Sequence, residues 1–197
     1  MKERVKKWYR TGRGEFQSMI TIRIFLFFLI LILSVFHSPA EGIDALLLKA
    51  EIKPIKGNPS APLFNLEDLS GKKINLKQYR GQVVFLNFWA TWCGPCKEEM
   101  PSMEALYKKS KERGFVFLTI SVDYEEKKMV KEFIDKHHYT FPVLIDSKCV
   151  TLDLYGVKGI PTTILIDKKG RMVGRAIGPK DWNRTEIVNI LNHLIGT

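Results

Sequence analysis

The 197-residue sequence has only three cysteines and four histidines, and their positions argue against a zinc site. A structural zinc site needs four ligands, which commonly come as two Cys or His pairs. Cys93 and Cys96 form one such pair, but Cys149 is the only other cysteine and no two histidines lie three to five residues apart. We therefore expect no metal ion and no other cofactor.

The sequence also lacks internal repeats, low-complexity segments and the basic–aromatic pattern of a nucleic-acid-binding surface. Its net charge of +10 is unevenly distributed. Residues 1–23 carry seven basic and two acidic side chains, which gives this segment a charge of +5. The remainder is only mildly basic, with 24 basic and 19 acidic residues, so we expect no nucleic-acid partner.

No apolar run reaches the about 20 residues that a full membrane span requires. The longest, residues 24–36, has 13 uncharged residues and follows the basic segment. We interpret residues 1–23 as a basic cytoplasmic leader and residues 24–40 as a signal anchor or signal peptide. Ser38 and Ala40 are small residues that permit cleavage after Ala40. A buried core helix is the alternative, and we favour an uncleaved anchor because so long a charged leader is unusual in a cleaved signal.

Both export interpretations place residues 41–197 outside the cytoplasm. The protein is then a single-pass protein of the cell membrane with a periplasmic or other extracytoplasmic domain, or a periplasmic protein if the leader is cleaved. A start at Met19 would shorten the leader and leave the apolar run intact. An oxidising compartment permits disulfides. A Cys93–Cys96 bridge closes too small a loop to stabilise the fold much, so the pair indicates a redox role.

The chain beyond the export segment divides into a tether and one domain. Pro54, Gly57 and Pro59 predict a tether over residues 41–60, with at most a helical turn at 45–50. Residues 61–197 predict an α/β domain with a mixed sheet and helices on both of its faces. It begins with a hairpin, residues 61–66 and 73–76. Strands are expected at 82–89, 115–122, 141–145, 162–166 and 171–177, and helices at 93–113, 125–138, 150–155 and 182–195.

The most informative motif is the sequence Trp92-Cys93-Gly94-Pro95-Cys96. A helix that begins at Cys93 points its positive N-terminal end at the sulfur and lowers the pKa of the thiol. The thiolate is the reactive species in thiol–disulfide exchange. Cys93 is therefore the expected nucleophile, and Cys96 the thiol that resolves the mixed disulfide.

Two separated motifs resemble those of thioredoxin-fold proteins: residues 87–96, with sequence NFWATWCGPC, and residues 159–163, with sequence GIPTT. The resemblance covers roughly residues 60–197. More narrowly, the chain resembles the TlpA/ResA group of exported thiol–disulfide oxidoreductases, in the redoxin (AhpC/TSA-like) part of the thioredoxin superfamily. An N-terminal hairpin, a helix and strand inserted at residues 124–146, and the sequence CKEEMP at 96–101 carry this narrower resemblance.

The resemblance implies roles for several residues. Pro161 is expected to be cis and to face the disulfide, with the backbone at Ile160 available to an extended substrate and Trp92 part of the surrounding surface. Glu99 corresponds to an active-site glutamate of the group and is expected to tune the cysteine pKa values or to exchange a proton with Cys96. Asn87 stands where thioredoxin has a buried acid, and an amide cannot transfer a proton.

The expected function is the reduction of protein disulfides. The Gly94-Pro95 dipeptide is that of reducing thioredoxins, whose potential is about −270 mV. The resemblance implies a membrane thiol protein as electron donor and apocytochrome c haem-site cysteines as a substrate class. One alternative is a peroxiredoxin-like antioxidant peroxidase, although the proline of a Pro-x-x-x-Thr-x-x-Cys motif is missing before Cys93.

A non-enzymatic thiol chaperone or copper-transfer protein is the other alternative, since two thiolates can bind Cu(I) and Met100 and Met103 lie close by in the sequence. Cys149 is expected to be a small residue at the start of a helix.

Overall fold

A computed structural model describes residues 42–110, 114–124 and 127–196. The expected leader, residues 1–23, and the expected export segment, residues 24–40, lie outside the described residues. Among the helices that the structure describes, none has both the length and the apolar character needed to cross a membrane.

One eight-stranded mixed sheet forms the centre of the domain and confirms the predicted α/β class. Its strands lie in the order β1-β8-β7-β4-β5-β6-β2-β3. Strands β4, β5 and β6 are parallel, and every other neighbouring pair is antiparallel. The strands are β1 (Lys53–Pro54), β2 (Asn65–Asp68), β3 (Lys73–Asn75), β4 (Val83–Trp89), β5 (Phe115–Ser121), β6 (Val143–Ile145), β7 (Thr162–Ile166) and β8 (Met172–Ile177).

Strand β4 is buried along its whole length because both faces of the sheet are covered. Successive side chains of a strand point to opposite faces. Phe85 therefore packs edge-on against Trp182 on one face, while Phe88 packs against Tyr155 on the other. Asn87 has the same parity as Phe85 and points to the same face. The continuous apolar run of β4 is the pattern expected of such a central strand.

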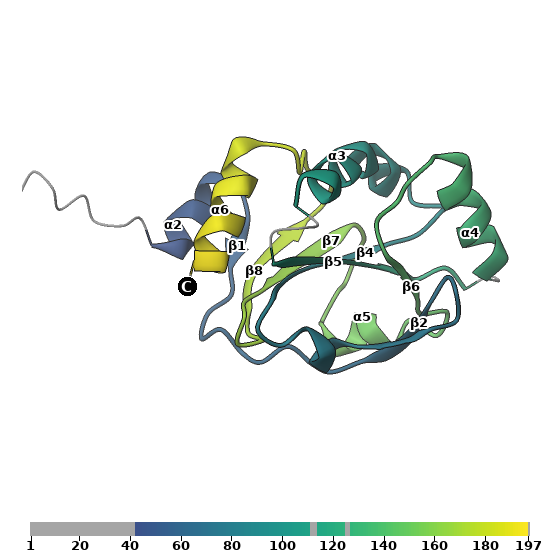
Figure 1. The fold of residues 1–197 in the computed structure, drawn as a ribbon, viewed down its shortest axis with the longest axis horizontal. Coiled ribbons are helices and arrows are strands. Elements are labelled where there is room, and N and C mark those ends of the chain that lie inside the picture. Colours follow the sequence, from purple (N-terminus) through teal and green to yellow (C-terminus); the bar gives the residue numbers. More distant parts are fainter. Residues whose placement is uncertain (1–41, 111–113, 125–126, 197) are drawn as a thin grey trace, which may run out of the picture. The chain divides into compact units, whose positions relative to one another are not determined.

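Helices α3 and α4 lie over one face of the sheet and α5 lies over the other (Figure 1). The helices are α2 (Ile43–Lys49), α3 (Gly94–Ser110), α4 (Lys127–Lys136), α5 (Val150–Leu154) and α6 (Thr185–Gly196), and a 3₁₀ helix spans Leu76–Tyr79. The predicted elements of residues 61–197 are present with their ends shifted by a few residues. Only the 3₁₀ helix was not expected there.

The prediction of a tether over residues 41–60 is wrong. Helix α2 packs against α6, and β1 adds an edge strand to β8, with Lys53 opposite Arg175. Leu47 and Ile52 are completely buried in these contacts. Pro54, Gly57 and Pro59 suggested a flexible segment, but the apolar residues before them pack against the core of the domain. The folded domain therefore includes residues 42–60.

Two adjacent leucines of α2 provide a test of this boundary. Leu47 is 0% exposed and Leu48 is 63% exposed. Leu47→Ala should lower the free energy of unfolding by about 2–5 kcal/mol, because it removes buried methyl groups and leaves a cavity. Leu48→Ala should change it by less than about 0.5 kcal/mol. Urea unfolding measures both values, and equal effects of the two substitutions would contradict the packing of α2 onto the domain.

Candidate active site

The two cysteines of the predicted motif form a disulfide at the carboxyl end of β4. Cys93 directly precedes α3, Cys96 lies in its first turn, and the S–S distance is 2.03 Å. Cys93 is 5% exposed and Cys96 is 1% exposed. The backbone N–H of Cys96 points at Sγ of Cys93 over 3.2 Å. After reduction, this N–H and the helix N-terminus favour the Cys93 thiolate, as the sequence predicts.

Asp123 anchors the segment that leads into the cysteines. Its buried carboxylate accepts hydrogen bonds from the backbone N–H and the hydroxyl of Thr91, the latter at 2.6 Å. The Ser121 hydroxyl donates to the same carboxylate at 2.7 Å. Sequence reasoning missed Asp123. The available signal was its position directly after a buried strand parallel to β4, which brings it to the same edge of the sheet as Thr91.

The loop before β7 contacts Cys93 through the backbone of Ile160. The Ile160–Pro161 peptide bond is cis, which confirms the predicted cis bond. The carbonyl oxygen of Ile160 lies 3.8 Å from Sγ of Cys93. After the disulfide is reduced, the Cys93 thiol can donate a weak S–H···O hydrogen bond to this oxygen. Trp92 directly precedes Cys93 in the sequence and is 62% exposed. The structure thus brings together Cys93, Trp92 and Ile160.

Glu99 is buried on α3, one helical turn after Cys96, and three donors hold its carboxylate. The indole N–H of Trp182 and the backbone N–H of Lys180 donate to Oε2, at 2.9 and 3.1 Å. The side-chain amide of Asn87 donates to Oε1 at 2.9 Å. Spacing of i, i+3 places Glu99 on the same face of the helix as Cys96. The sequence singled out Glu99 and Asn87 but did not predict their contact, and it missed Trp182.

Burial raises the pKa of Glu99 from 4.5 to about 7, because desolvation penalises the charged carboxylate. The hydrogen bonds from Trp182, Asn87 and the Lys180 backbone, and the positive charge of Lys180, oppose this effect only in part. Glu99 therefore changes its protonation state near neutral pH. A group with that property, one helical turn from Cys96, is suited to exchange protons with a thiol.

Asn87 connects Glu99 to strand β7. It is completely buried, and its Nδ2 also donates to the Thr163 hydroxyl at 2.9 Å. Its Oδ1 is buried and has no hydrogen-bond partner among the described residues. The sequence showed only that Asn87 cannot transfer a proton, whereas the structure shows it in direct contact with the carboxylate that can.

A surface cleft of about 380 Å³ reaches Glu99 from the solvent. Its lining joins the first turns of α3 to the segment before α6: Glu98, Glu99, Pro101, Ser102, Pro179, Lys180 and Asp181. The Ser102 hydroxyl donates to the Glu99 carbonyl at 2.7 Å and accepts from the backbone N–H of Trp182 at 3.0 Å, which ties the two walls together. Glu99 therefore forms part of the wall of a cleft that is open to solvent.

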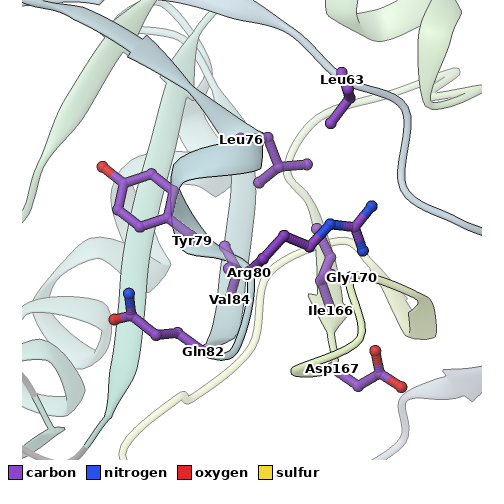
Figure 2. A pocket seen from close by; sticks show the side chains of 9 residues that line it. All are labelled: Leu63, Leu76, Tyr79, Arg80, Gln82, Val84, Ile166, Asp167 and Gly170. Carbon is purple, nitrogen blue, oxygen red and sulfur yellow. The ribbon is translucent and has the colours of Figure 1, made fainter.

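A second pocket lies at the opposite end of β4, away from the cysteines (Figure 2). Its volume is about 10 Å³, and the Arg80 side chain passes beside Gly170 to donate to the Lys169 carbonyl. A Cβ at position 170 would collide with the Arg80 guanidinium, so only glycine permits this contact. The arrangement joins two loops and leaves no room for a ligand.

Cys149 occupies the N-cap of α5, as expected for a small residue at a helix start. Its Sγ lies 3.6 Å from the carbonyl oxygen of Val122. The cysteine is free and partly buried. It takes no part in the described disulfide.

Comparisons with known proteins agree with this geometry. Residues 58–175 match the AhpC/TSA family. The thiol-disulfide oxidoreductase ResA of Bacillus thuringiensis (strain Al Hakam) is 45% identical over 126 residues, which are 64% of this chain and 72% of that protein. The family match alone does not separate thiol–disulfide exchange from a peroxidase activity, but the ResA match favours exchange over the peroxidase and copper-transfer alternatives.

Solved structures give the same fold. StoA from Bacillus subtilis is 30% identical with a TM-score of 0.55, covering 61% of this chain and 90% of StoA. The pneumococcal exposed lipoprotein thioredoxin Etrx1 from Streptococcus pneumoniae is 30% identical with a TM-score of 0.60, covering 68% of this chain and all of Etrx1. The predicted thioredoxin fold is confirmed.

The raised pKa of Glu99 predicts a specific pH dependence of stability. Between pH 4.5 and about 7 the folded protein binds more protons at this site than the unfolded chain, so the free energy of unfolding falls as pH rises. The total loss should be about 3 kcal/mol, since one pKa unit corresponds to about 1.4 kcal/mol. Urea unfolding of the disulfide form at several pH values, compared with Glu99→Gln, isolates this contribution.

The exposed neighbour Glu98 provides the control, because Glu98→Gln should retain the wild-type pH dependence. A difference between wild type and Glu99→Gln that stays constant from pH 4 to pH 8 would show that Glu99 titrates normally.

Proposed function

The chain belongs to the AhpC/TSA family and is a thiol–disulfide oxidoreductase, and from this premise we propose that it reduces disulfide bonds in exported proteins. The main observation behind this proposal is the Cys93–Cys96 disulfide, which directly follows the exposed Trp92 and contacts the cis-Pro161 loop through the Ile160 carbonyl. The Gly94-Pro95 dipeptide between the cysteines, shared with reducing thioredoxins, supports the reducing direction. Neither the disulfide nor the fold requires a cofactor for this reaction.

Trp92, Ile160 and Pro161 are the proposed contacts of the substrate. The Ile160 carbonyl lies beside Sγ of Cys93, so a polypeptide placed along this loop brings its own sulfur within reach of the nucleophile. The exposed Trp92, next to Cys93 in the sequence, offers a flat apolar surface for the substrate. Contacts between the substrate and the main chain at Ile160 select an extended polypeptide with little regard to its sequence.

The proposed reaction transfers two electrons from the cysteine pair to the substrate. The Cys93 thiolate attacks one sulfur of the substrate disulfide, the substrate S–S bond breaks, and the departing thiolate takes up a proton. The Cys96 thiolate then attacks Sγ of Cys93 and displaces the second substrate sulfur, which is also protonated. The enzyme is left with the Cys93–Cys96 disulfide that the structure contains, and an external dithiol must reduce it.

Glu99 is the proposed proton acceptor for Cys96. A neutral thiol is a poor nucleophile, so the resolving step requires that Cys96 lose its proton. Glu99 lies one turn away on the same helical face, and its pKa of about 7 allows it both to accept and to release a proton. The cleft that Glu99 lines together with Pro101 and Lys180 is the proposed route by which this proton reaches solvent.

The proposed location is the outer face of the cell membrane, with residues 24–40 as the anchor. The apolar run and the basic residues before it support this proposal, as does the name of the solved relative Etrx1, an exposed lipoprotein thioredoxin. A membrane thiol protein would then supply electrons, and the haem-site cysteines of apocytochrome c are the proposed substrate class.

Substitution of each cysteine tests the assignment of the nucleophile. Cys93→Ser should lower the rate of reduction of a model peptide disulfide at least about a hundredfold, because a hydroxyl does not form the mixed disulfide. Cys149→Ser is the matched control and should keep the wild-type rate. A Cys93→Ser protein that retained full activity in a dithiothreitol-coupled assay would refute the assignment.

Trapping in cells tests the substrate and the donor. Cys96→Ala in a Cys149→Ser background should accumulate mixed disulfides, because the resolving thiol is missing. We expect exported cysteine-containing proteins, apocytochrome c among them, and a membrane thiol protein to be attached through Cys93. Trapped partners confined to the cytoplasm would contradict the proposed location, and the absence of apocytochrome c from a strain that makes it would contradict the substrate class.

A further inference from the structure

The hydrogen bonds around Glu99 suit only one of its two protonation states. The Trp182 indole, the Lys180 backbone N–H and the Asn87 amide all donate to the carboxylate. An ionised carboxylate accepts such bonds, whereas a protonated carboxyl also has an O–H that needs an acceptor. Burial brings the pKa of Glu99 to about 7, so both states are populated near neutral pH. The neutral state therefore requires a different arrangement of neighbours.

Of the three donors, only Asn87 can also provide an acceptor. A backbone N–H and an indole N–H carry no acceptor atom, but a side-chain amide carries both a carbonyl oxygen and an NH₂ group. The Oδ1 of Asn87 is buried and has no partner among the described residues. Rotation of the amide by about 180° about the Cβ–Cγ bond exchanges the positions of Oδ1 and Nδ2.

We propose that Asn87 is a positioning residue whose amide rotates when Glu99 gains or loses a proton. With Glu99 ionised, Nδ2 donates to Oε1, as observed. With Glu99 neutral, the proton resides on Oε1 and that O–H donates to Oδ1 of Asn87. The proton comes from solvent or from the Cys96 thiol and returns to either. When Cys96 gives it up, the negative charge passes from Glu99 to the Cys96 thiolate, and Asn87 and Thr163 stay uncharged throughout.

Thr163 is the partner that allows both orientations. Its hydroxyl now accepts a hydrogen bond from Nδ2 at 2.9 Å. A hydroxyl is also a donor, so after the rotation it can donate to Oδ1. Asn87 makes two hydrogen bonds in each orientation, and the rotation only changes which amide atom is left without a partner. Oε2 keeps its bonds to Trp182 and Lys180 throughout, which holds the carboxyl group in place.

The surroundings of Glu99 contain few other groups that titrate. Lys180 contributes the nearest positive charge, from the segment before α6. Glu98 and Asp181 line the same cleft, and Cys96 lies on the same helix. Cys96 cannot titrate in the disulfide form, and β4 and β7 contribute only the uncharged Asn87 and Thr163. Proton uptake by Glu99 is therefore the event to which the amide responds.

The use of this rotation in turnover rests on the proposed proton exchange between Glu99 and Cys96. The rotation itself requires only that Glu99 take up a proton. It is therefore testable in the disulfide form, where the outcome does not depend on the reductase function. An amide at position 87 thus accommodates a buried acid in both of its states.

Neutron diffraction tests the proposal, because it distinguishes nitrogen from oxygen and locates deuterium. Crystals of the full-length disulfide form, grown in detergent, are measured at pH 8.5 and at pH 5.5. At pH 8.5 the ND₂ group of Asn87 should face Glu99. At pH 5.5 Oδ1 should face Glu99, with deuterium on Oε1. A deuterated Glu99 beside an unrotated Asn87, or deuterium on Oε2, would overturn the proposal.

A Glu99→Gln protein makes the test independent of the actual pKa. Trp182 and Lys180 need an acceptor, so the carbonyl oxygen of the introduced amide should take their side and its NH₂ group should face Asn87. Oδ1 of Asn87 should then face the side chain at position 99 at both pH values. The matched control, Glu98→Gln, should keep the wild-type orientations. An Asn87 that still presents ND₂ to the introduced amide would overturn the proposal.

Discussion

The buried carboxylate of Glu99 is the constraint around which the site is built. A carboxylate taken out of water requires hydrogen-bond donors, and here they come from strand β4 and from the segment before α6. The segment that contains Lys180 and Trp182 must therefore lie against the first turns of α3. Trp182 also packs on Phe85 in the centre of the sheet, so the same contact serves the core and the site.

The topology of the sheet accounts for the rest of the site. Because β4 and β5 are parallel, their carboxyl ends lie at one edge, and Cys93 and Asp123 follow those ends. Strand β7 runs antiparallel to β4, so its beginning, just after Pro161, lies at the same edge. Such a fold can support many functions. The disulfide, the cis-proline loop and the titrating carboxylate at this edge are what make it suited to thiol–disulfide exchange.

Local patterns in the sequence predicted local features well. The buried strands, the hairpin, the cysteine pair at a helix start and the i, i+3 position of Glu99 all depend on neighbouring residues, and resemblance added the cis bond at Pro161. Contacts between distant residues were missed. Asn87 meets Thr163 across 76 positions, and Trp182 meets Glu99 across 83. Helix α2 was expected as no more than a helical turn within a tether, because its partner α6 lies about 140 residues further along the sequence.

The central claim, that Glu99 exchanges the proton of the resolving thiol, is tested most directly by single-turnover kinetics. Reduced enzyme is mixed with a fluorescent peptide disulfide, and the phase that follows formation of the mixed disulfide is followed from pH 5 to pH 9. Wild type and Glu98→Gln should show an inflection at a pH of about 7 that Glu99→Gln lacks. Identical pH profiles for all three proteins would contradict the account.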